Sequence, residues 1–366
     1  MLSKENMQSY TQQYFTYSLQ LSQRELEIKQ RMAARLPKRI IDLHSHLGRL
    51  EDALDLDQAL YTNIISTYPY CTYEEHLTAR KNLWPQDIEI TQIAFGFPFR
   101  GIDIRQSNLY IQTIASQDPL FIPFLTGEPY DIAYTQKELE TGRWHGLKMY
   151  LYQLNTSAER ITDFFPLPIL ETANALQLPI ILHLPHNIIE DCSELTQLAE
   201  RYPDLPFVIA HFGMARGTPQ AIKEALTATK SYPNIYYDTS FFQDQEVFCS
   251  GLGILGPEKI FYASDQPFNL LRVEFTNHPS FGERLMVDYP YHWADPEEQQ
   301  YYREMTGLLP EQFLNFHYGS MQALLQAIDT VYSSQALRDS AIDNIFFRNA
   351  RQLLRLPSEA SRFATL

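Results

Sequence analysis

Eight short apolar segments, rich in β-branched and aromatic residues, alternate along this chain with longer stretches of helical periodicity. From the third segment onward they recur at regular intervals, each the length of one strand and one helix. They are continuously apolar rather than alternating, which is typical of strands buried on both faces of a parallel sheet. The segments are residues 39–46, 90–97, 120–127, 146–152, 178–184, 206–212, 234–240 and 259–265.

This alternation predicts the α/β class. Eight parallel strands with intervening helices are enough to close a (β/α)8 barrel, also called a TIM barrel. An open doubly wound sheet is the alternative, and it needs strands on both sides of a switch point. The closed barrel is therefore the favoured prediction.

Three segments exceed a minimal barrel. Residues 1–37 are predicted to form a helical N-terminal extension, and residues 38–366 the barrel domain itself. Residues 47–88 form a long connection after the first strand, and residues 266–340 form an aromatic-rich insertion of largely helical pattern after the eighth. Both follow the carboxyl end of a strand, where barrel enzymes place their sites, so they predict a lid or substrate pocket. An amphipathic helix at 345–356 is expected to close the chain.

Composition narrows the class of partner. The 366 residues carry 29 basic and 44 acidic side chains, a net charge of −15. This charge disfavours nucleic acid and anionic membrane surfaces. The three cysteines form no close pair, and no apolar run of signal-peptide or membrane-spanning kind is present. A reducing compartment is the simpler interpretation, and the predicted location is the cytoplasm.

Polar residues stand at the carboxyl tips of several predicted strands. They are His44, His46, His183, His211 and Asp265. The spacing of His44 and His46 puts both imidazoles on one face of a strand. Each residue alone is more often a satisfied core histidine or a helix N-cap. In a closed barrel, however, the tips converge, and buried imidazoles beside a carboxylate are costly unless they are paired or bind a metal.

With these residues in place, the chain resembles the amidohydrolase superfamily, in particular its amidohydrolase-related branch of metal-dependent TIM-barrel hydrolases and decarboxylases. The matching pieces are His-x-His in IDLHSHLG, the lysine of GLKMYLY, the histidines of LPIILHLP and PDLPFVIAHFG, and the aspartate of YASDQPF. They span about residues 39–269 in the same order. The N-terminal 37 residues and residues 270–340 find no counterpart.

The resemblance implies a divalent metal, with zinc favoured and manganese or iron as alternatives. The ligands it implies are His44, His46, His183 and Asp265. One ion is favoured over two; Lys148 and His211 become ligands only in a binuclear centre. Asp265 and His211 are the expected catalytic residues, with Asp265 accepting the proton of a metal-activated water and His211 polarising the carbonyl.

The reaction predicted on this basis is hydrolysis of a small amide, lactone or ester. The closest alternative is a metal-dependent, non-oxidative decarboxylase of the same superfamily, and the next is a non-catalytic metal-binding barrel. The expected partner is a small-molecule substrate, and the resemblance also allows a homo-oligomer.

Loop residues supply candidates for substrate binding. Arg216 and Arg272 have the chemistry to hold a substrate carboxylate, and His186 follows the fifth strand. Each has the ordinary alternative of a solvated loop residue. Aromatic residues of the 281–302 segment either line a pocket or simply pack. They are Phe281, Tyr289, Tyr291, Trp293, Tyr301 and Tyr302.

Overall fold

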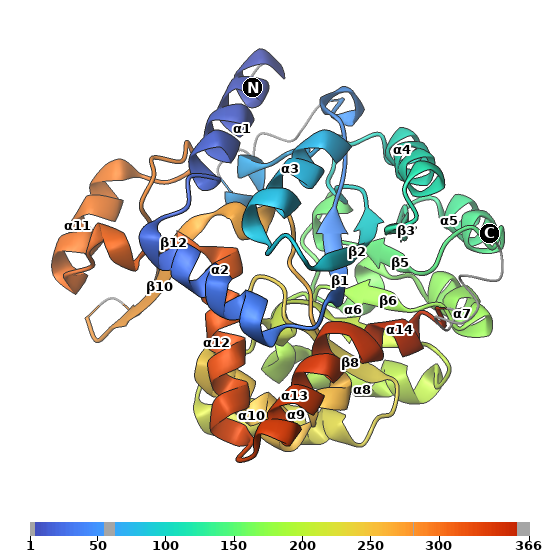
Figure 1. The fold of residues 1–366 in the computed structure, drawn as a ribbon. Helices are drawn as coiled ribbons and strands as arrows, with labels where there is room; N and C mark the ends of the chain where they lie inside the picture. Colours follow the sequence, from blue (N-terminus) through green and yellow to red (C-terminus); the bar gives the residue numbers. More distant parts are fainter. Residues whose placement is uncertain (1–3, 55–62, 281, 357–366) are drawn as a thin grey trace.

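The computed structural model describes residues 4–54, 63–280 and 282–356 and is built around a (β/α)8 barrel (Figure 1). The third barrel strand is interrupted at Phe124, so nine short elements make eight barrel strands. They are β1 (Arg39–His46), β2 (Glu89–Phe95), β3 (Phe121–Pro123), β4 (Leu125–Thr126), β5 (Leu147–Met149), β6 (Ile180–Leu182), β7 (Phe207–Ile209), β8 (Ile235–Asp238) and β9 (Ile260–Phe261). Every apolar segment predicted as a strand contains one.

The barrel is closed between its first and last strands. All neighbouring barrel strands pair in parallel, in chain order. The Leu43 amide donates to the Tyr262 carbonyl at 3.1 Å, and the His46 amide donates to the Gln266 carbonyl at 2.7 Å. These bonds join β1 to the segment that follows β9, which excludes the open doubly wound sheet.

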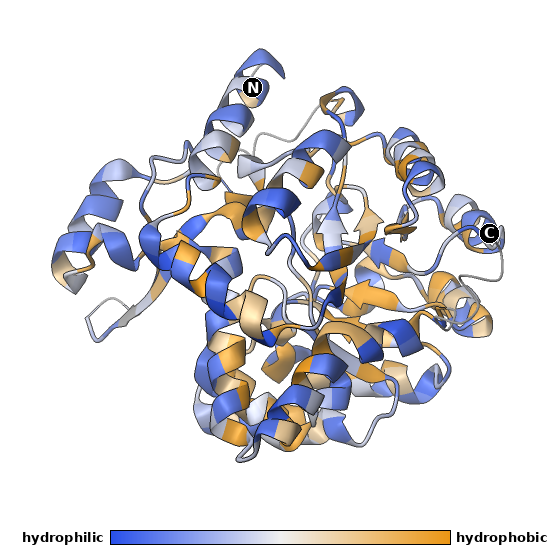
Figure 2. Ribbon diagram, in the orientation of Figure 1, coloured by the Kyte–Doolittle hydropathy of each residue, from blue (hydrophilic) through white to orange (hydrophobic). Residues whose placement is uncertain are grey.

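Apolar side chains fill the barrel interior. Figure 2 shows the hydrophobic character of the barrel strands along the ribbon. The interior cluster draws on nearly every strand, because inward positions recur at every second residue. Its strand members include Ile41, Leu43, Ile93, Phe95, Ile122, Phe124, Ile181, Val208 and Phe261. Ala350 and Leu354, at the end of the chain, pack against the same cluster. The expected closing helix is present as a π-helical turn (Asn344–Arg348) followed by α14 (Asn349–Leu353).

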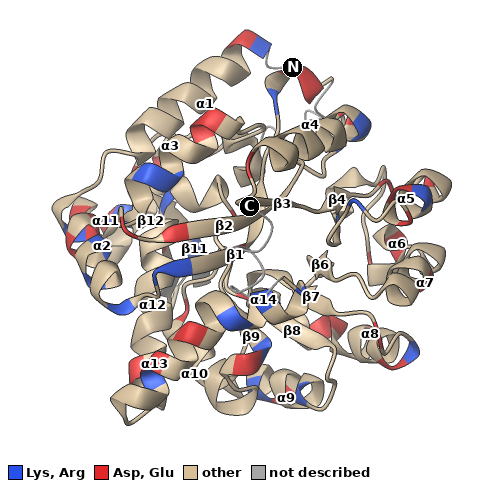
Figure 3. Ribbon diagram, turned by 45° about the vertical axis from the view of Figure 1, so that its right-hand side comes forward, with Lys and Arg blue, Asp and Glu red and all other residues tan. Residues whose placement is uncertain are grey.

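Helices surround the barrel, and their apolar faces form a second, larger core with the outer side of the strands. Charged side chains of both signs are spread over these helices (Figure 3). The surrounding helices are α3 (Tyr73–Leu83), α4 (Ile104–Gln117), α5 (Ile132–Leu139), α6 (Ile161–Phe164), α7 (Leu167–Leu176), α8 (Ile188–Arg201), α9 (Pro219–Lys230), α10 (Gln245–Ile254), α12 (Phe316–Val331) and α13 (Gln335–Asp343). Among the described residues, no helix is long and apolar enough to cross a membrane.

The N-terminal extension is helical, as expected, and consists of α1 (Lys4–Ser18) and α2 (Gln23–Arg35). The insertion after the eighth strand, predicted as largely helical, contains α11 (Pro296–Thr306), α12 and most of α13, and also strands that the sequence did not predict. It begins with an antiparallel hairpin of β10 (Arg272–His278) and β11 (Gly282–Val287), to which β12 (Leu314–Asn315) adds a third strand. Its helix α11 stands with the hairpin at the side of the barrel (Figure 1). The sequence periodicity missed the hairpin, whose two strands are only seven and six residues long.

Candidate active site

A β-bulge in the first strand turns both of its histidines into the barrel. Asp42 pairs with Gln92 and Ser45 with Ala94, so Leu43 and His44 together face one residue of β2. Strict alternation would put Leu43 and His44 on opposite faces. The extra residue lets Leu43 join the interior cluster while His44 and His46 also point inward. Bulges commonly re-aim a side chain beside an active site in this way.

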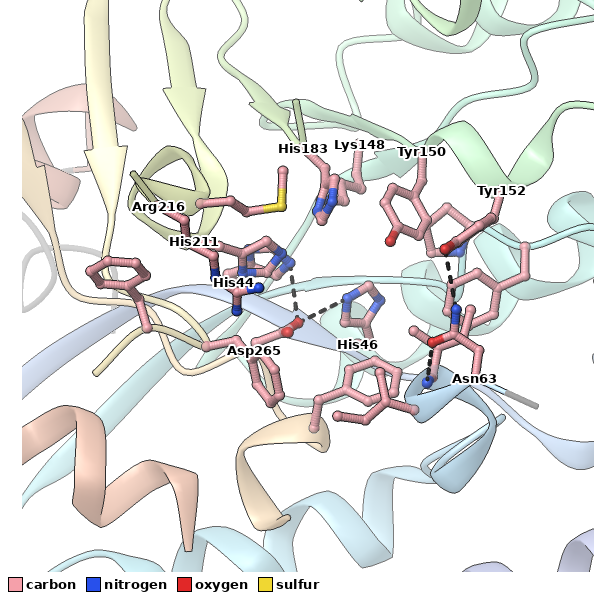
Figure 4. A pocket seen from close by; sticks show the side chains of 18 residues that line it. His44, His46, Asn63, Lys148, Tyr150, Tyr152, His183, His211, Arg216 and Asp265 are labelled. Carbon is pink, nitrogen blue, oxygen red and sulfur yellow. Dashed lines mark hydrogen bonds and ion pairs between the residues drawn. The ribbon is translucent and has the colours of Figure 1, made fainter. Parts of the chain in front are cut away.

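His44, His46 and Asp265 form the one close group of potential metal ligands among the described residues. The Asp265 Oδ1 atom lies 3.3 Å from His44 Nε2 and 3.2 Å from His46 Nε2. Figure 4 shows both imidazoles turned toward this carboxylate. All three residues are buried. Asp265 itself has a left-handed φ of 57°, and its amide donates to the His44 carbonyl at 2.9 Å, which fixes the two residues together.

The other ring nitrogen of each histidine is already engaged. His46 Nδ1 lies 3.1 Å from the Gly96 carbonyl oxygen, and His44 Nδ1 lies 2.9 Å from a carboxylate oxygen of Asp238. A carbonyl and an ionised carboxylate only accept, so both Nδ1 atoms carry the proton. The Nε2 lone pairs therefore face the Asp265 carboxylate, an arrangement of acceptors that a cation between them satisfies. This donor set fits a divalent metal, whose histidine ligands are typically held in this way.

Burial favours the protonation states in which these three residues can bind a metal. Burial, with a further contribution from the Lys148 ammonium, holds the pKa of His44 well below its usual value, and burial also lowers the pKa of His46. Burial alone would raise the pKa of Asp265, but the neighbouring His44 and the hydrogen bond from His46 outweigh it and lower that pKa. Neutral imidazoles beside an ionised carboxylate are the protonation states that a metal requires.

The remaining predicted strand-tip residues line the same cavity, which has a volume of about 400 Å³. His183 follows β6, and its ring centroid lies 4.8 Å from that of His211, which follows β7. The His211 ring is in turn 5.3 Å from that of His44. His183 is outside the close ligand group and makes no hydrogen bond to another described residue. Lys148, at the centre of β5, is buried, and burial lowers its pKa to about 8, against the opposing pull of the Asp265 and Asp238 carboxylates.

Six of the 18 residues that line the cavity are aromatic. Tyr150 packs edge-on against His183, with ring centroids 4.6 Å apart. Asn63, within the long connection after the first strand, donates to the Tyr152 hydroxyl at 3.2 Å and so holds that ring at the rim. The aromatic residues that line the cavity are Phe99, Tyr150, Tyr152, Phe241, Phe242 and Phe268. Of the insertion after the eighth strand, only Phe268 among the described residues reaches this lining. Residues 55–62 of the long connection lie outside the described residues.

His211 opens a left-handed turn that sequence reasoning did not anticipate. His211, Phe212, Gly213 and Met214 have φ values of 56°, 50°, 68° and 46°. This conformation costs roughly 1–2 kcal/mol for each residue other than glycine. The His211 amide donates to Asp238 at 2.8 Å, and the buried Phe212 ring fits against Gly251, where a Cβ would lie 2.4 Å from Cζ. Strain of this kind is typical of functional sites.

The three candidate substrate contacts in the loops have different outcomes. Arg216 lines the cavity at its exposed rim, with its guanidinium 5.0 Å from the centre of the Phe275 ring. Arg272 lies elsewhere: it is buried and pairs with Glu25 of α2 at 2.6 Å, so the substrate-binding expectation is corrected to a structural one. His186 also lies outside the cavity, where its Nδ1 binds Asp191 at 3.0 Å.

The aromatic residues of the insertion pack rather than line the cavity. Tyr291 and Tyr289 contact Tyr14 of α1, with ring centroids 5.0 and 5.8 Å away. Trp293 stacks on Tyr291 at 5.5 Å and donates to Thr67. Tyr301 and Tyr302 contact each other on α11, and Phe281 lies outside the described residues. The insertion therefore fastens α1 and the 64–67 turn to the barrel.

Asp238 and Ser240 contact the site histidines but were not singled out from the sequence. Both are buried at the end of β8, and both contact His44 and His211. Their position in NIYYDTS, at the tip of the seventh strand, carried the same signal as Asp265 at the tip of the eighth.

Comparison with known proteins gives a family and a fold. The family model described as Amidohydrolase matches residues 87–356. No curated protein matches the chain. Among solved structures, 5-carboxyvanillate decarboxylase from Sphingomonas paucimobilis is 15% identical over 88% of this chain and 100% of its own, with a TM-score of 0.56.

Two further solved structures contain a metal in their descriptions. An amidohydrolase from Burkholderia multivorans with bound zinc is 13% identical over 87% of this chain and 99% of its own, with a TM-score of 0.52. A 5-carboxyvanillate decarboxylase from Novosphingobium aromaticivorans, complexed with manganese and 4-hydroxy-3-methoxy-5-nitrobenzoic acid, is 13% identical over 87% and 96%, with a TM-score of 0.51. At these identities the likeness establishes the barrel fold.

Proposed function

Because the chain belongs to the amidohydrolase family, we propose that it is a metal-dependent enzyme that removes carbon dioxide from a small aromatic or unsaturated carboxylic acid without an oxidant. The observation that carries this proposal is the cavity lining. Lys148 and Arg216 bring two cationic side chains into a cavity whose lining also includes six aromatic side chains and four imidazoles. A planar acid matches both features, whereas a neutral amide or lactone uses neither cation.

His44, His46 and Asp265 would hold the ion, with His183 as a further ligand. A divalent ion supplies Lewis-acid polarisation of a substrate oxygen when it is bound there. Its identity, zinc or manganese, is open to measurement. Solved fold relatives with zinc and with manganese support a divalent ion of this kind.

The chain's own residues account for the rest of the reaction. The carbon–carbon bond to the carboxylate breaks, carbon dioxide leaves, and the electron pair stays on the ring carbon, which takes up one proton. Asp265 and His211 are the groups on the cavity wall able to hold that proton. Lys148, Arg216 and the aromatic walls position the acid and exclude water.

Hydrolysis of a small amide, lactone or ester is the second candidate, and one observation favours it. The lowered pKa of Asp265, where His44 and the bond from His46 outweigh burial, leaves an ionised carboxylate that suits a general base toward water. The two reactions differ in what they consume. Decarboxylation takes up a solvent proton and no water; hydrolysis takes up water and releases no carbon dioxide.

The test uses protein loaded with zinc or with manganese, in deuterium oxide and in ¹⁸O-labelled water. Hydroxybenzoic acids labelled with ¹³C in the carboxyl group, esters, lactones and amides are offered in turn. We expect labelled carbon dioxide and one deuterium on the ring carbon. Incorporation of ¹⁸O without carbon dioxide would replace the proposal by hydrolysis. No turnover of any compound by fully loaded protein would favour a non-catalytic barrel.

Arg216→Met and Lys148→Met serve as matched variants. Each keeps most of the apolar stem and loses the charge. Both are expected to raise KM for acids more than for neutral compounds. An equal change in KM for acids and for neutral compounds would contradict the proposal that these two cations bind the substrate carboxylate.

A further inference from the structure

We propose that Asp238 and Ser240 act together as the positioning pair of the metal centre, holding His44 and His211 in the single tautomer that presents Nε2 to the cavity. The inference rests on the metal centre of the proposed function but not on the reaction performed there. It concerns two residues at the end of β8 that touch the imidazoles from behind and do not line the cavity.

Asp238 lies where four donors converge. Its Oδ2 atom is 2.9 Å from His44 Nδ1. Its Oδ1 atom accepts from the His211 amide at 2.8 Å, from the Ser240 amide at 3.0 Å and from the Ser240 hydroxyl at 2.6 Å. The two backbone amides and the hydroxyl donate to Oδ1, and an ionised carboxylate accepts at Oδ2 as well. His44 Nδ1 must therefore carry its proton.

Ser240 applies the same constraint to the second ring. His211 Nδ1 lies 3.1 Å from the Ser240 carbonyl oxygen and 3.0 Å from the Ser240 hydroxyl oxygen. The carbonyl only accepts, and the single hydroxyl proton is already donated to Asp238. His211 Nδ1 is consequently also protonated, and its Nε2 carries the lone pair.

One carboxylate thus fixes a metal-facing imidazole and the backbone of its neighbour. The His211 amide that bonds Asp238 begins the left-handed turn of residues 211–214, so the same contact stabilises the strained backbone that presents the His211 ring. His44 and His211 rings are 5.3 Å apart, and both depend on this pair. Removing an outer carboxylate of this kind typically lowers metal affinity about 10- to 100-fold.

The experiment compares wild type, Asp238→Asn and Ser240→Ala. The isosteric amide of Asp238→Asn cannot accept from both His44 Nδ1 and the His211 amide, because one of its atoms donates. Affinity for Zn²⁺ and for Mn²⁺ is measured by competition with a chelator. We expect a loss of about 10- to 100-fold for Asp238→Asn and a smaller loss for Ser240→Ala, which keeps the carbonyl acceptor.

Thr239→Val is the matched control. Thr239 is buried between the two residues, but its hydroxyl bonds the backbone of Ala263 and touches neither imidazole. It is expected to lower stability while leaving metal affinity unchanged. An equal loss of affinity in Thr239→Val and Asp238→Asn would show that packing, rather than positioning, sets the affinity, and would overturn the proposal.

Imidazole ¹⁵N spectra of the metal-free protein give a readout that needs no turnover, and the wild-type spectrum tests the inference even where a variant fails to fold. In wild type, His44 and His211 should both be the Nδ1–H tautomer, and His44 should lose this preference in Asp238→Asn. Rings in the Nε2–H form in wild type would overturn the inference. Wild type that binds no metal while showing the expected tautomers would instead count against the proposed function alone.

Discussion

Asp265 is the residue on which the chemistry of the cavity converges. Its carboxylate faces His44 and His46 within 3.3 Å and is held in a left-handed backbone conformation by the first strand. Asp265→Asn keeps the shape and removes the charge. We expect turnover to fall by about 10²- to 10⁴-fold while some metal is retained, because the proposed histidine ligands His44, His46 and His183 remain.

The measurement is kcat together with metal content on the same preparation. Asp191→Asn is the control, since Asp191 binds His186 outside the cavity and should not alter turnover. Near-wild-type turnover in Asp265→Asn would remove Asp265 from any role in proton transfer.

Buried histidines away from the cavity make stability depend on pH. His317 packs against Trp84, with ring centroids 4.9 Å apart, and its Nε2 has no hydrogen-bond partner among the described residues. Burial, aided by the Lys29 charge, lowers its pKa from 6.5 to about 3. As the pH falls, His317 of the unfolded chain therefore takes up a proton near its ordinary pKa, whereas His317 of the folded protein stays neutral. The free energy of unfolding is not reduced by His317 above the pKa of the unfolded chain. It falls as the pH drops from that pKa toward the pKa of His317 in the folded protein.

His317→Phe should remove this part of the pH dependence. Between about pH 7.5 and about pH 5, the contribution of one such histidine is on the order of 2 kcal/mol. Urea unfolding of both proteins at the two pH values measures it. If the free energy of unfolding falls equally on acidification in wild type and in His317→Phe, His317 is not the source of this pH dependence.

At the scale of elements, the N-terminal extension is locked to the insertion through one buried ion pair. Glu25 closes the capping box of α2 with Ser22, and its carboxylate also accepts from Arg272 at 2.6 Å and from the Asn315 amide at 2.6 Å. A helix, a hairpin strand and the start of α12 thus meet on one carboxylate. This explains why Arg272 lies away from the cavity although it is near the eighth strand in sequence.

Arg272→Met is expected to destabilise the protein by about 3–5 kcal/mol, because it leaves Glu25 buried without its cation. Glu25→Gln combined with Arg272→Met should recover part of that loss. Urea unfolding gives the free energies, and KM of the variant that remains folded is the second readout. A raised KM with unchanged stability would return Arg272 to substrate binding.

At the scale of the whole molecule, the proposed metal centre would couple ion binding to folding, because its ligands come from opposite ends of the barrel sequence. An ion that binds only the folded protein adds about 2.7 kcal/mol at a free concentration of about 100 times its Kd. Chelation should therefore lower Tm, and re-addition of zinc or manganese should restore it. Metal content by plasma mass spectrometry is measured alongside, with His183→Ala as the matched variant.

About one ion per chain in wild type, with a sharp fall in His183→Ala, is the expected outcome. Two ions with added mass on Lys148 would instead establish a binuclear centre. Unchanged content in His183→Ala would leave the ion to His44, His46 and Asp265, the group that lies closest together. The homo-oligomer implied by the family stays a prediction.

The sequence by itself determined the barrel and the strand tips. Apolar runs of strand length are forced into a doubly covered sheet because nothing else buries both faces. The same logic placed His44, His46, His183, His211 and Asp265 around one opening, as the cavity lining has them.

The tertiary structure decided the features of the site that the hydrophobic and polar pattern of the sequence does not encode. The bulge that turns His44 inward depends on pairing with β2, and the left-handed turn at His211 depends on Asp238 and on the space at Gly251. Glu25, the partner of Arg272, lies 247 positions away in the chain. The strand β10 forms because it pairs with β11. Periodicity reports how a residue relates to its own element, whereas these features arise from contacts between distant segments, whose geometry only the folded chain contains.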